Sequence, residues 1–101
     1  MKEYYIRSID KGNSNAINNL GYYYHHIEKN YIQMKKYYIM AIEKGNVMAM
    51  ENLGHYYQFT EKNYDKMKIY YKEAIKKGNV LAMENLGHYY QFTEKNYDKM
   101  K

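Results

Sequence analysis

Apolar side chains along this chain recur at the spacing of an α-helix. Ala49, Leu53 and Tyr57 follow one another every four residues, which places them on one side of a helix. A second group has spacings of four, three and one residue: Met67, Tyr71, Ala74 and Ile75. We therefore expect a first helix at about residues 47 to 59 and a second at about residues 64 to 77, each with one apolar stripe.

The same pattern returns along the chain with a period of 33 residues. Residues 45–68 and 78–101 agree at every position except one, where Met48 corresponds to Leu81. Shared composition cannot produce such agreement, so this segment is a duplicated unit. Three further sets of residues keep the period: Gly12, Gly45 and Gly78; Ala16, Ala49 and Ala82; and Leu20, Leu53 and Leu86, each followed by glycine.

A period of this length is typical of solenoids, in which each unit buries its apolar face only against its neighbours. The connection at residues 60–63 is short and polar, so the two helices of a unit are expected to pack antiparallel as a hairpin. The sequence predicts one all-α domain over residues 1–101, a solenoid of about three repeats. Its parts are the second helix of a leading repeat at 1–12, repeats at 13–45 and 46–78, and an incomplete repeat at 79–101.

Glycine has two predicted roles in each repeat. Gly45 and Gly78 come where a second helix must end, and glycine takes the left-handed conformation of a helix end without a steric penalty. Gly21, Gly54 and Gly87 lie inside the first helices, where glycine costs about 0.5–1 kcal/mol relative to alanine. Close approach of another helix is the compensation that we expect.

Composition restricts the classes of function. The chain has no cysteine, which rules out disulfides, thiolate zinc sites and a cysteine nucleophile. The N-terminus carries charges where a signal peptide needs apolar residues, and no apolar run approaches the ~18 residues of a membrane span. We therefore expect an intracellular protein, in the cytoplasm. The net charge of +5 would suit an acidic partner, but lysines interleaved with acidic residues are typical of solvated helix faces.

Residues that could perform chemistry do not converge. The sequence has no nucleophile placed with a base and no glycine loop of the phosphate-binding kind, so we predict no enzyme activity and no cofactor. His55 and His88 are a full repeat apart, and the neighbours His25 and His26 point along directions about 100° apart on a helix. We therefore predict no metal site.

The repeat resembles a known family. Residues 49–57 read Ala-Met-Glu-Asn-Leu-Gly-His-Tyr-Tyr and residues 70–78 read Tyr-Tyr-Lys-Glu-Ala-Ile-Lys-Lys-Gly, a pattern similar to the Sel-one-like repeat of the tetratricopeptide-like superfamily. The pattern returns at 16–24 with 37–45, at 82–90 and at 4–12, so the resemblance covers nearly the whole chain. The connection at 58–64 is three residues shorter than is usual in that family. Gly-Asn, in place of the proline that commonly ends a tetratricopeptide repeat, favours the Sel-one-like family.

This resemblance implies a right-handed superhelix of antiparallel helix hairpins. Its concave side would be formed largely by first helices and would bind a protein or an extended peptide, so that the chain acts as an adaptor or scaffold. Function within such families is diverse. A structural, self-assembling role is therefore the alternative.

One face of each first helix lies beside the apolar stripe and is the expected binding surface. Its members are separated by three or four residues. Partner contacts are expected from Asn19, Tyr22, Glu51, Asn52, His55, Gln58, Glu84, Asn85, His88 and Gln91. The asparagine before each Leu-Gly pair resembles one with which some tetratricopeptide domains hold a ligand's main chain, because an amide both donates and accepts. Alternatively, each asparagine hydrogen-bonds a neighbouring repeat or water.

Paired tyrosines with interleaved lysines permit a further hypothesis, nucleic-acid binding, since rings stack on bases and ammonium groups contact phosphates. Core packing explains the tyrosines more simply, because repeat position places one member of each pair at the contact between helices. The pairs are Tyr23 and Tyr24, Tyr37 and Tyr38, Tyr56 and Tyr57, Tyr70 and Tyr71, and Tyr89 and Tyr90.

The two ends of the chain carry an expectation of their own. Met1 has the repeat position of Met34, Met67 and Met100, so the chain opens on a second helix and closes as another begins. Solenoids usually need polar capping repeats, and neither end has that character. Either the chain is a fragment of a longer array, or its ends associate with a second copy.

Overall fold

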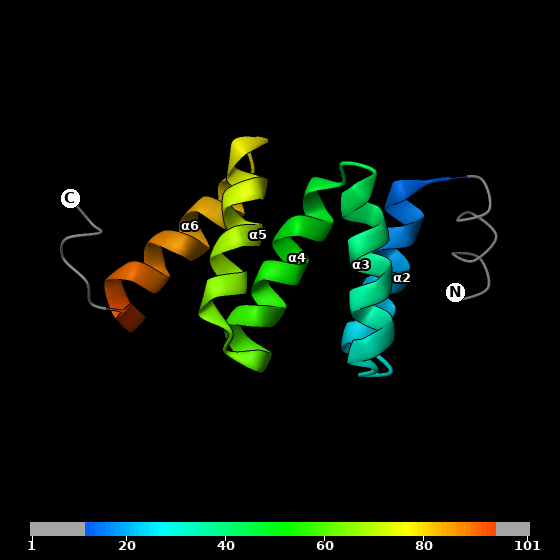
Figure 1. Cartoon of the computed structure of the whole chain (residues 1–101), viewed down its shortest axis with the longest axis horizontal. Coiled ribbons are helices and arrows are strands. Elements are labelled where there is room, and N and C mark those ends of the chain that lie inside the picture. The colour runs from blue at the N-terminus through cyan, green and yellow to red at the C-terminus, as the bar shows by residue number, and fades with distance from the viewer. Residues whose placement is uncertain (1–11, 95–101) are drawn as a thin grey trace.

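A computed structural model of the protein describes residues 12–94 (Figure 1). All regular structure in this range is helical, which confirms the all-α prediction there. The elements are α2 (Ser14–His26), α3 (Tyr31–Glu43), α4 (Val47–Tyr56), η1 (Tyr57–Glu61), α5 (Tyr64–Lys76), α6 (Val80–His88) and η2 (Tyr89–Glu94). The π-helical segments η1 and η2 continue α4 and α6 directly. The helix expected at 1–12 and the last residues of the incomplete repeat lie outside the described range.

The bounds of the helices agree closely with the apolar pattern. The second helix expected at 64 to 77 is α5, which ends one residue earlier. The first helix expected at 47 to 59 reaches Glu61, because η1 prolongs α4. The carbonyl of Tyr57 accepts from the N–H groups of Lys62 and Asn63, and Lys62 adopts a left-handed conformation with φ 56°. This wide last turn ends the first helix two residues later than the pattern predicted.

Each Gly-Asn pair ends one helix and begins the next. Gly45 has φ 85°, its N–H donates to the Ile42 carbonyl, and the N–H of Asn46 donates to the Ala41 carbonyl. This is the hydrogen-bonded helix end that a left-handed glycine permits, as predicted. The Asn46 side chain then accepts from the N–H of Ala49 and caps α4. Asn13 and Asn79 cap α2 and α6 in the same way, a role that the sequence analysis missed.

The helices stand side by side in chain order (Figure 1). Each helix packs against the helices before and after it in the sequence. The first helices of the repeats, α2, α4 and α6, also contact one another, α2 with α4 and α4 with α6. Within residues 12–94 the second helices, α3 and α5, make no such contact. No helix in that range has the length and apolar character needed to cross a lipid bilayer.

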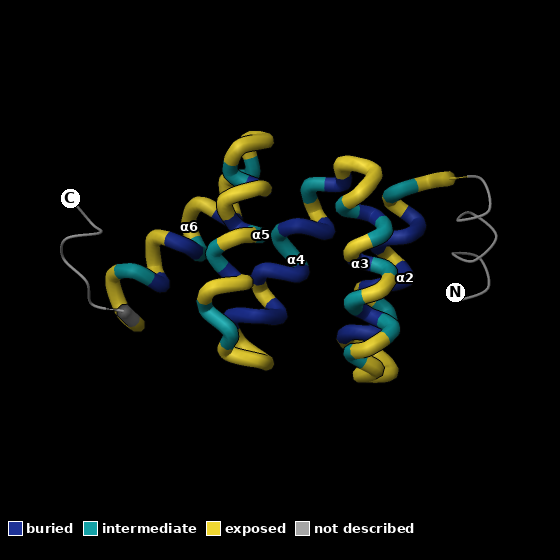
Figure 2. Tube along the Cα trace, viewed as in Figure 1, coloured by how far each residue is buried: buried dark blue, intermediate teal, exposed yellow. Residues whose placement is uncertain are grey.

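The core runs through the stack as one cluster of buried side chains (Figure 2). The predicted apolar stripes are buried, except that Ile75 is only half-buried. The largest side chains with almost no exposed surface come from α2, α3, α4 and α5: Tyr38, Tyr71, Ile17, Leu20, Met34, Leu53 and Met67. Tyrosine and methionine therefore supply much of the core.

Glycines inside the first helices leave space for a tyrosine ring. A Cβ atom on Gly21 would lie 2.6 Å from Cδ1 of Tyr38, and one on Gly54 would lie 2.6 Å from Cδ1 of Tyr71. Both rings are fully buried. The predicted close approach is therefore confirmed at two of the three positions. At Gly87 no atom of the described residues lies within 4 Å of that point.

Candidate functional site

The first helices together form a hollow of about 350 Å³. The first helices of three successive repeats contribute to it, and its lining consists of Tyr22 and His26 from α2, Glu51, Asn52 and His55 from α4, and Leu81 and Asn85 from α6. Tyr22 and His55 have the same repeat position, as do Asn52 and Asn85. Two repeat positions therefore each contribute side chains from two neighbouring repeats to the lining of the hollow.

Five of the ten residues expected to contact a partner line this hollow: Tyr22, Glu51, Asn52, His55 and Asn85. Four others are exposed and lie outside it: Asn19, Glu84, His88 and Gln91. Gln58 is buried and accepts a hydrogen bond of 2.8 Å from the Tyr71 hydroxyl, so it packs between helices. The expected face is brought together mainly at α4, because within residues 12–94 α4 alone has a first helix on each side.

His26 was missed by the sequence analysis. It stands four residues after Tyr22, so both lie on one side of α2, and their ring centroids are 4.2 Å apart. Its ring also stacks on that of His25 with centroids 4.0 Å apart, although neighbouring positions of a helix diverge. The spacing from Tyr22 was the signal that could have placed His26 in the hollow.

The two asparagines of the hollow are held by hydrogen bonds to other repeats. Asn52 Nδ2 donates to Asn18 Oδ1 over 3.1 Å, and the Asn85 side chain hydrogen-bonds the Tyr71 hydroxyl. These bonds match the alternative interpretation, in which asparagine ties neighbouring repeats together. Each amide nevertheless keeps hydrogen-bonding capacity, because an amide oxygen accepts twice and its nitrogen donates twice.

The tyrosines beneath the hollow have different hydroxyl partners. The Tyr38 hydroxyl lies 3.3 Å from Nδ1 of His25, whereas the Tyr71 hydroxyl donates to Gln58. Burial raises the pKa of Tyr38 and of Tyr71 well above the ordinary tyrosine value, and the nearby Glu51 carboxylate raises both further. Both hydroxyls therefore stay protonated, and that of Tyr71 is a hydrogen-bond donor to Gln58.

Three histidines gather near the hollow and are neutral at pH 7. Burial, with smaller contributions from His26 and His55, lowers the pKa of His25 to about 4. Burial also lowers the pKa of His26 and of His55. The described residues contain no group of three side chains of the metal-ligating types placed to hold a metal ion.

Glu51 is the acidic side chain of the hollow and is half-buried. Burial raises the pKa of its carboxyl group, and no cation among the described residues opposes that shift. Its repeat equivalents differ, since Asn18 is a buried neutral amide and Glu84 is exposed outside the hollow.

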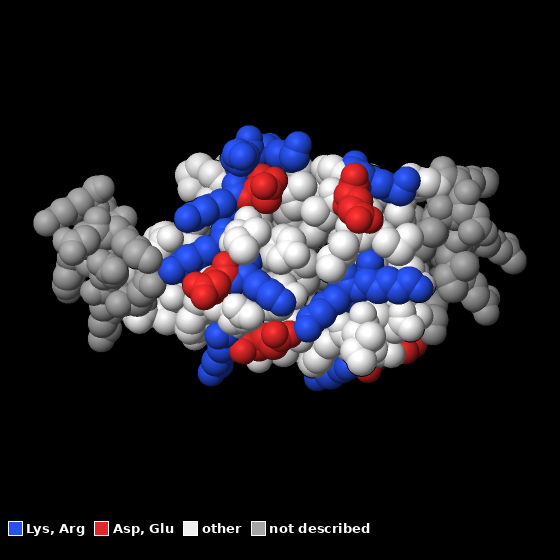
Figure 3. All heavy atoms as spheres, in the orientation of Figure 1, with Lys and Arg blue, Asp and Glu red and all other residues white. Residues whose placement is uncertain are grey.

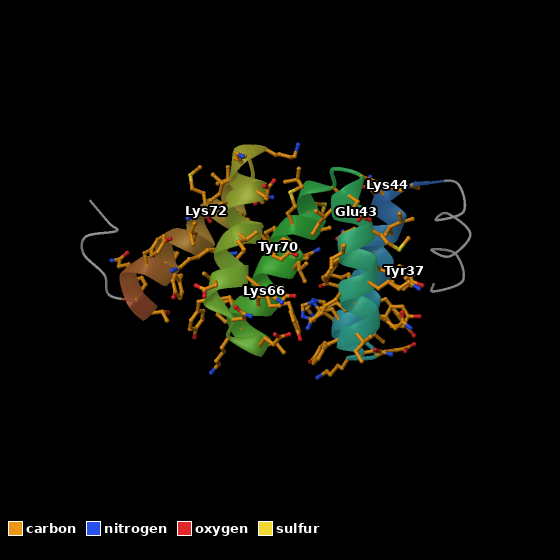
Figure 4. The ribbon with its side chains drawn as sticks, in the orientation of Figure 1. Tyr37, Glu43, Lys44, Lys66, Tyr70 and Lys72 are labelled. Atoms are coloured by element: carbon orange, nitrogen blue, oxygen red, sulfur yellow. The ribbon has the colours of Figure 1, made fainter. Side chains whose placement is uncertain are left out.

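The opposite surface is formed by the second helices. Figure 4 shows Tyr37 of α3 and Lys66, Tyr70 and Lys72 of α5 on this side, and lysines gather there among acidic side chains (Figure 3). All ten paired tyrosines are buried or half-buried. Tyr37 stacks on Tyr24, with ring centroids 5.6 Å apart. These rings are used for packing, which favours the simpler interpretation of the tyrosine pairs.

A larger hollow of about 580 Å³ lies elsewhere, around the turn between η1 and α5. Its lining is Glu61, Lys62, Asn63, Tyr64, Asp65, Lys68 and Tyr89. None of these residues was expected to contact a partner. Six of the seven residues lie between Glu61 and Lys68, and the seventh, Tyr89, belongs to η2, so this hollow lies between the turn and η2.

No protein-family model matches the chain, and a search of curated proteins finds no match.

Proposed function

We propose that this chain is a non-catalytic adaptor or scaffold that binds a protein or an extended peptide on the surface formed by α2, α4 and α6. In this proposal the hairpins form a right-handed superhelix of Sel-one-like repeats. The observation that carries the proposal is the hollow of about 350 Å³, to which three successive first helices contribute. Two pairs of its lining residues occupy equivalent repeat positions, as an extended ligand crossing the repeats would require.

The contacts between helices support a concave surface on this side. Neighbouring first helices touch, while α3 and α5 do not within the described range. A stack that bends with its first helices on the inner side has this pattern of contacts. Solenoids use such curved inner surfaces for binding.

Selection from a phage-displayed library of random extended peptides tests the proposal. The full chain serves as the target, and the selected peptides are measured by fluorescence anisotropy. Replacing Asn52 and Asn85 together by alanine should weaken binding at least tenfold, because both side chains line the hollow. The matched control is Lys36→Ala with Lys72→Ala, two exposed lysines of the opposite surface.

The control variant should bind as the unmodified chain does, and thermal melts followed by circular dichroism establish that both double variants are folded. Unchanged affinity in the folded asparagine variant, with every selected peptide, would show that the first-helix surface is not the binding site.

A second candidate function is self-assembly through α6, and the surroundings of Gly87 favour it. Gly21 and Gly54 each face a buried tyrosine ring, but no described residue fills the corresponding space at Gly87. Met83 is 54% exposed, whereas its repeat equivalents Ile17 and Met50 are buried. Among the described residues nothing covers this face of α6, and we propose that a helix of a second copy packs against it.

Light scattering of the full chain over a range of concentrations tests self-assembly. The mass should rise with concentration, and Gly87→Leu should suppress the rise by filling the space beside α6. A strictly monomeric mass at high concentration contradicts this second function and leaves the first intact.

A further inference from the structure

The hollow presents hydrogen-bond acceptors to a ligand. The Tyr71 hydroxyl uses its proton on Gln58, so Asn85 donates in the hydrogen bond that it makes with this hydroxyl. Asn52 likewise uses its amide nitrogen on Asn18. One N–H of each amide is engaged within the protein, so each amide keeps one N–H and both acceptor positions of its oxygen. The two oxygens therefore offer more positions than the two remaining N–H groups, which favours a ligand rich in donors.

Glu51 adds a negative charge to these oxygens. Its carboxylate is half-buried in the same hollow, and no ion pair to it is formed within the described residues. Burial of an unpaired carboxylate is unfavourable, as the raised pKa of Glu51 reflects. The equivalent position in α2 avoids this penalty with the neutral Asn18, and Glu84 in α6 avoids it by exposure. Glu51 alone of the three holds an unpaired charge inside a hollow.

We propose that the hollow binds a lysine or arginine side chain of an extended peptide, with Glu51 as its counterion. The amide oxygens of Asn52 and Asn85 accept further hydrogen bonds from the ammonium or guanidinium group. Leu81 is 56% exposed and Tyr22 is 50% exposed, so both offer apolar surface to the side chain's methylene groups. This inference rests on the proposed function, since it names the ligand of the same surface.

The charge distribution of the molecule supports this ligand. His26 and His55 are neutral at pH 7, because burial lowers the pKa of each, and they do not repel a cation there. Lysines gather on the opposite surface (Figure 3). The net charge of +5 suggests an acidic partner, but the hollow carries the opposite sign. A basic side chain therefore finds at Glu51 a favourable site on a protein that repels it elsewhere.

The test uses four blocked pentapeptides, acetyl-Ser-Ala-X-Ala-Ser-amide, in which X is lysine, arginine, norleucine or glutamate. Each is titrated into the full chain at pH 7 while chemical shifts are followed by NMR. The lysine and arginine peptides should shift the signals of Tyr22, Asn52 and Asn85, and bind about tenfold more tightly than the norleucine peptide. The glutamate peptide should not bind.

Two variants identify the group responsible. Glu51→Gln keeps the shape and an acceptor oxygen but removes the charge, so it should weaken the lysine peptide about tenfold and leave the norleucine peptide unchanged. Glu84→Gln is the matched control, because Glu84 has the same repeat position, is exposed and does not line the hollow. It should change neither affinity.

Two results would overturn the inference. Equal binding of the lysine and norleucine peptides in the hollow means that charge does not select the ligand, while the proposed peptide-binding function stands. Absence of shifts in the hollow with the lysine and arginine peptides also overturns the basic ligand. In that case the displayed library, which contains every side chain, decides separately whether the surface binds peptides at all.

Discussion

The hairpins α2–α3 and α4–α5 share one packing arrangement but differ in its polar part. In both, a glycine of the first helix faces a fully buried tyrosine of the second, Gly21 with Tyr38 and Gly54 with Tyr71. The hydroxyl partner of that tyrosine is histidine in one hairpin and glutamine in the other. The apolar contact therefore defines the hairpin, while its polar end is free to vary. In the first hairpin that partner is His25, a side chain that titrates.

The largest expected effect on stability distinguishes a glycine that faces a tyrosine ring, Gly54, from one that does not, Gly87. Gly54→Ala should destabilise the protein by about 2–3 kcal/mol, at the upper end of the range for overpacking, because its Cβ would meet a buried ring. Gly87→Ala should stabilise it by about 0.5–1 kcal/mol, since alanine is the better helix former and nothing described obstructs it. Urea unfolding of both variants measures the difference. Destabilisation of equal size at both positions would contradict the ring contact as the cause.

The next effect concerns the two hydroxyl partners. The pKa of His25 is about 4 in the folded protein and about 6.5 when unfolded, so the unfolded chain binds more protons between these values. Stability is therefore complete above about pH 6.5 and should fall by about 2 kcal/mol towards pH 4.5. His25→Gln introduces the residue that the second hairpin has at this position, Gln58, and should remove the part of the stability loss that is due to His25. His26 and His55 remain, so some pH dependence should persist.

Urea unfolding at pH 7.5 and pH 4.5 provides the measurement. The control is Gln58→His, which places the titrating side chain against Tyr71 and should increase the loss of stability at acid pH. If His25→Gln leaves the pH dependence unchanged, another group is responsible for it.

A smaller effect distinguishes the caps of the first and the second helix of one repeat. Asn46 caps α4 and also donates to Ser14 and Asn15 of the preceding repeat, whereas Asn63 caps α5 through the N–H of Lys66. Asn63→Ala should cost about 1 kcal/mol, and Asn46→Ala about 1–2 kcal/mol, because it also removes contacts between repeats. Thermal melts of the two variants test this order. Equal losses would show that the contacts between repeats contribute nothing.

The smallest effect is an increase in stability without ligand. The pKa of Glu51 is raised on folding, so its ionisation opposes folding above about pH 4.3, and this opposition disappears at lower pH. Glu51→Gln should therefore raise stability at pH 7 by less than about 1 kcal/mol, whereas Glu84→Gln should leave it unchanged. Melting temperatures at pH 7 and pH 3.5 compare them. A lower melting temperature of Glu51→Gln at pH 7 would contradict an unpaired charge.

Much of the local structure followed from the sequence. The spacing of apolar residues predicted α5 within one residue, and Gly45 and Gly78 take the left-handed conformation expected of them. The wide turn of η1 was not predicted, because its geometry depends on two N–H groups that share the Tyr57 carbonyl. The spacing of apolar residues does not predict these two hydrogen bonds.

The candidate site was predicted less completely. Periodicity identified the face that carries Asn52 and His55, but it treated three repeats as equivalent. The described structure makes them unequal, because α4 has a first helix on both sides while α2 and α6 each contact one. Gln58 was assigned to this face and is buried against Tyr71, because the helix continues into η1 there.

The sequence by itself determined the helices, the glycines that end each second helix and the glycines that face a tyrosine ring, since these depend on spacing and on the conformational preferences of single residues. Only the tertiary structure decided that Glu51 lies half-buried in the hollow, while Asn18 is tied to Asn52 and Glu84 is exposed. The physical reason is that charge and burial are set by neighbours from other repeats. Repetition makes local patterns alike but leaves their surroundings different.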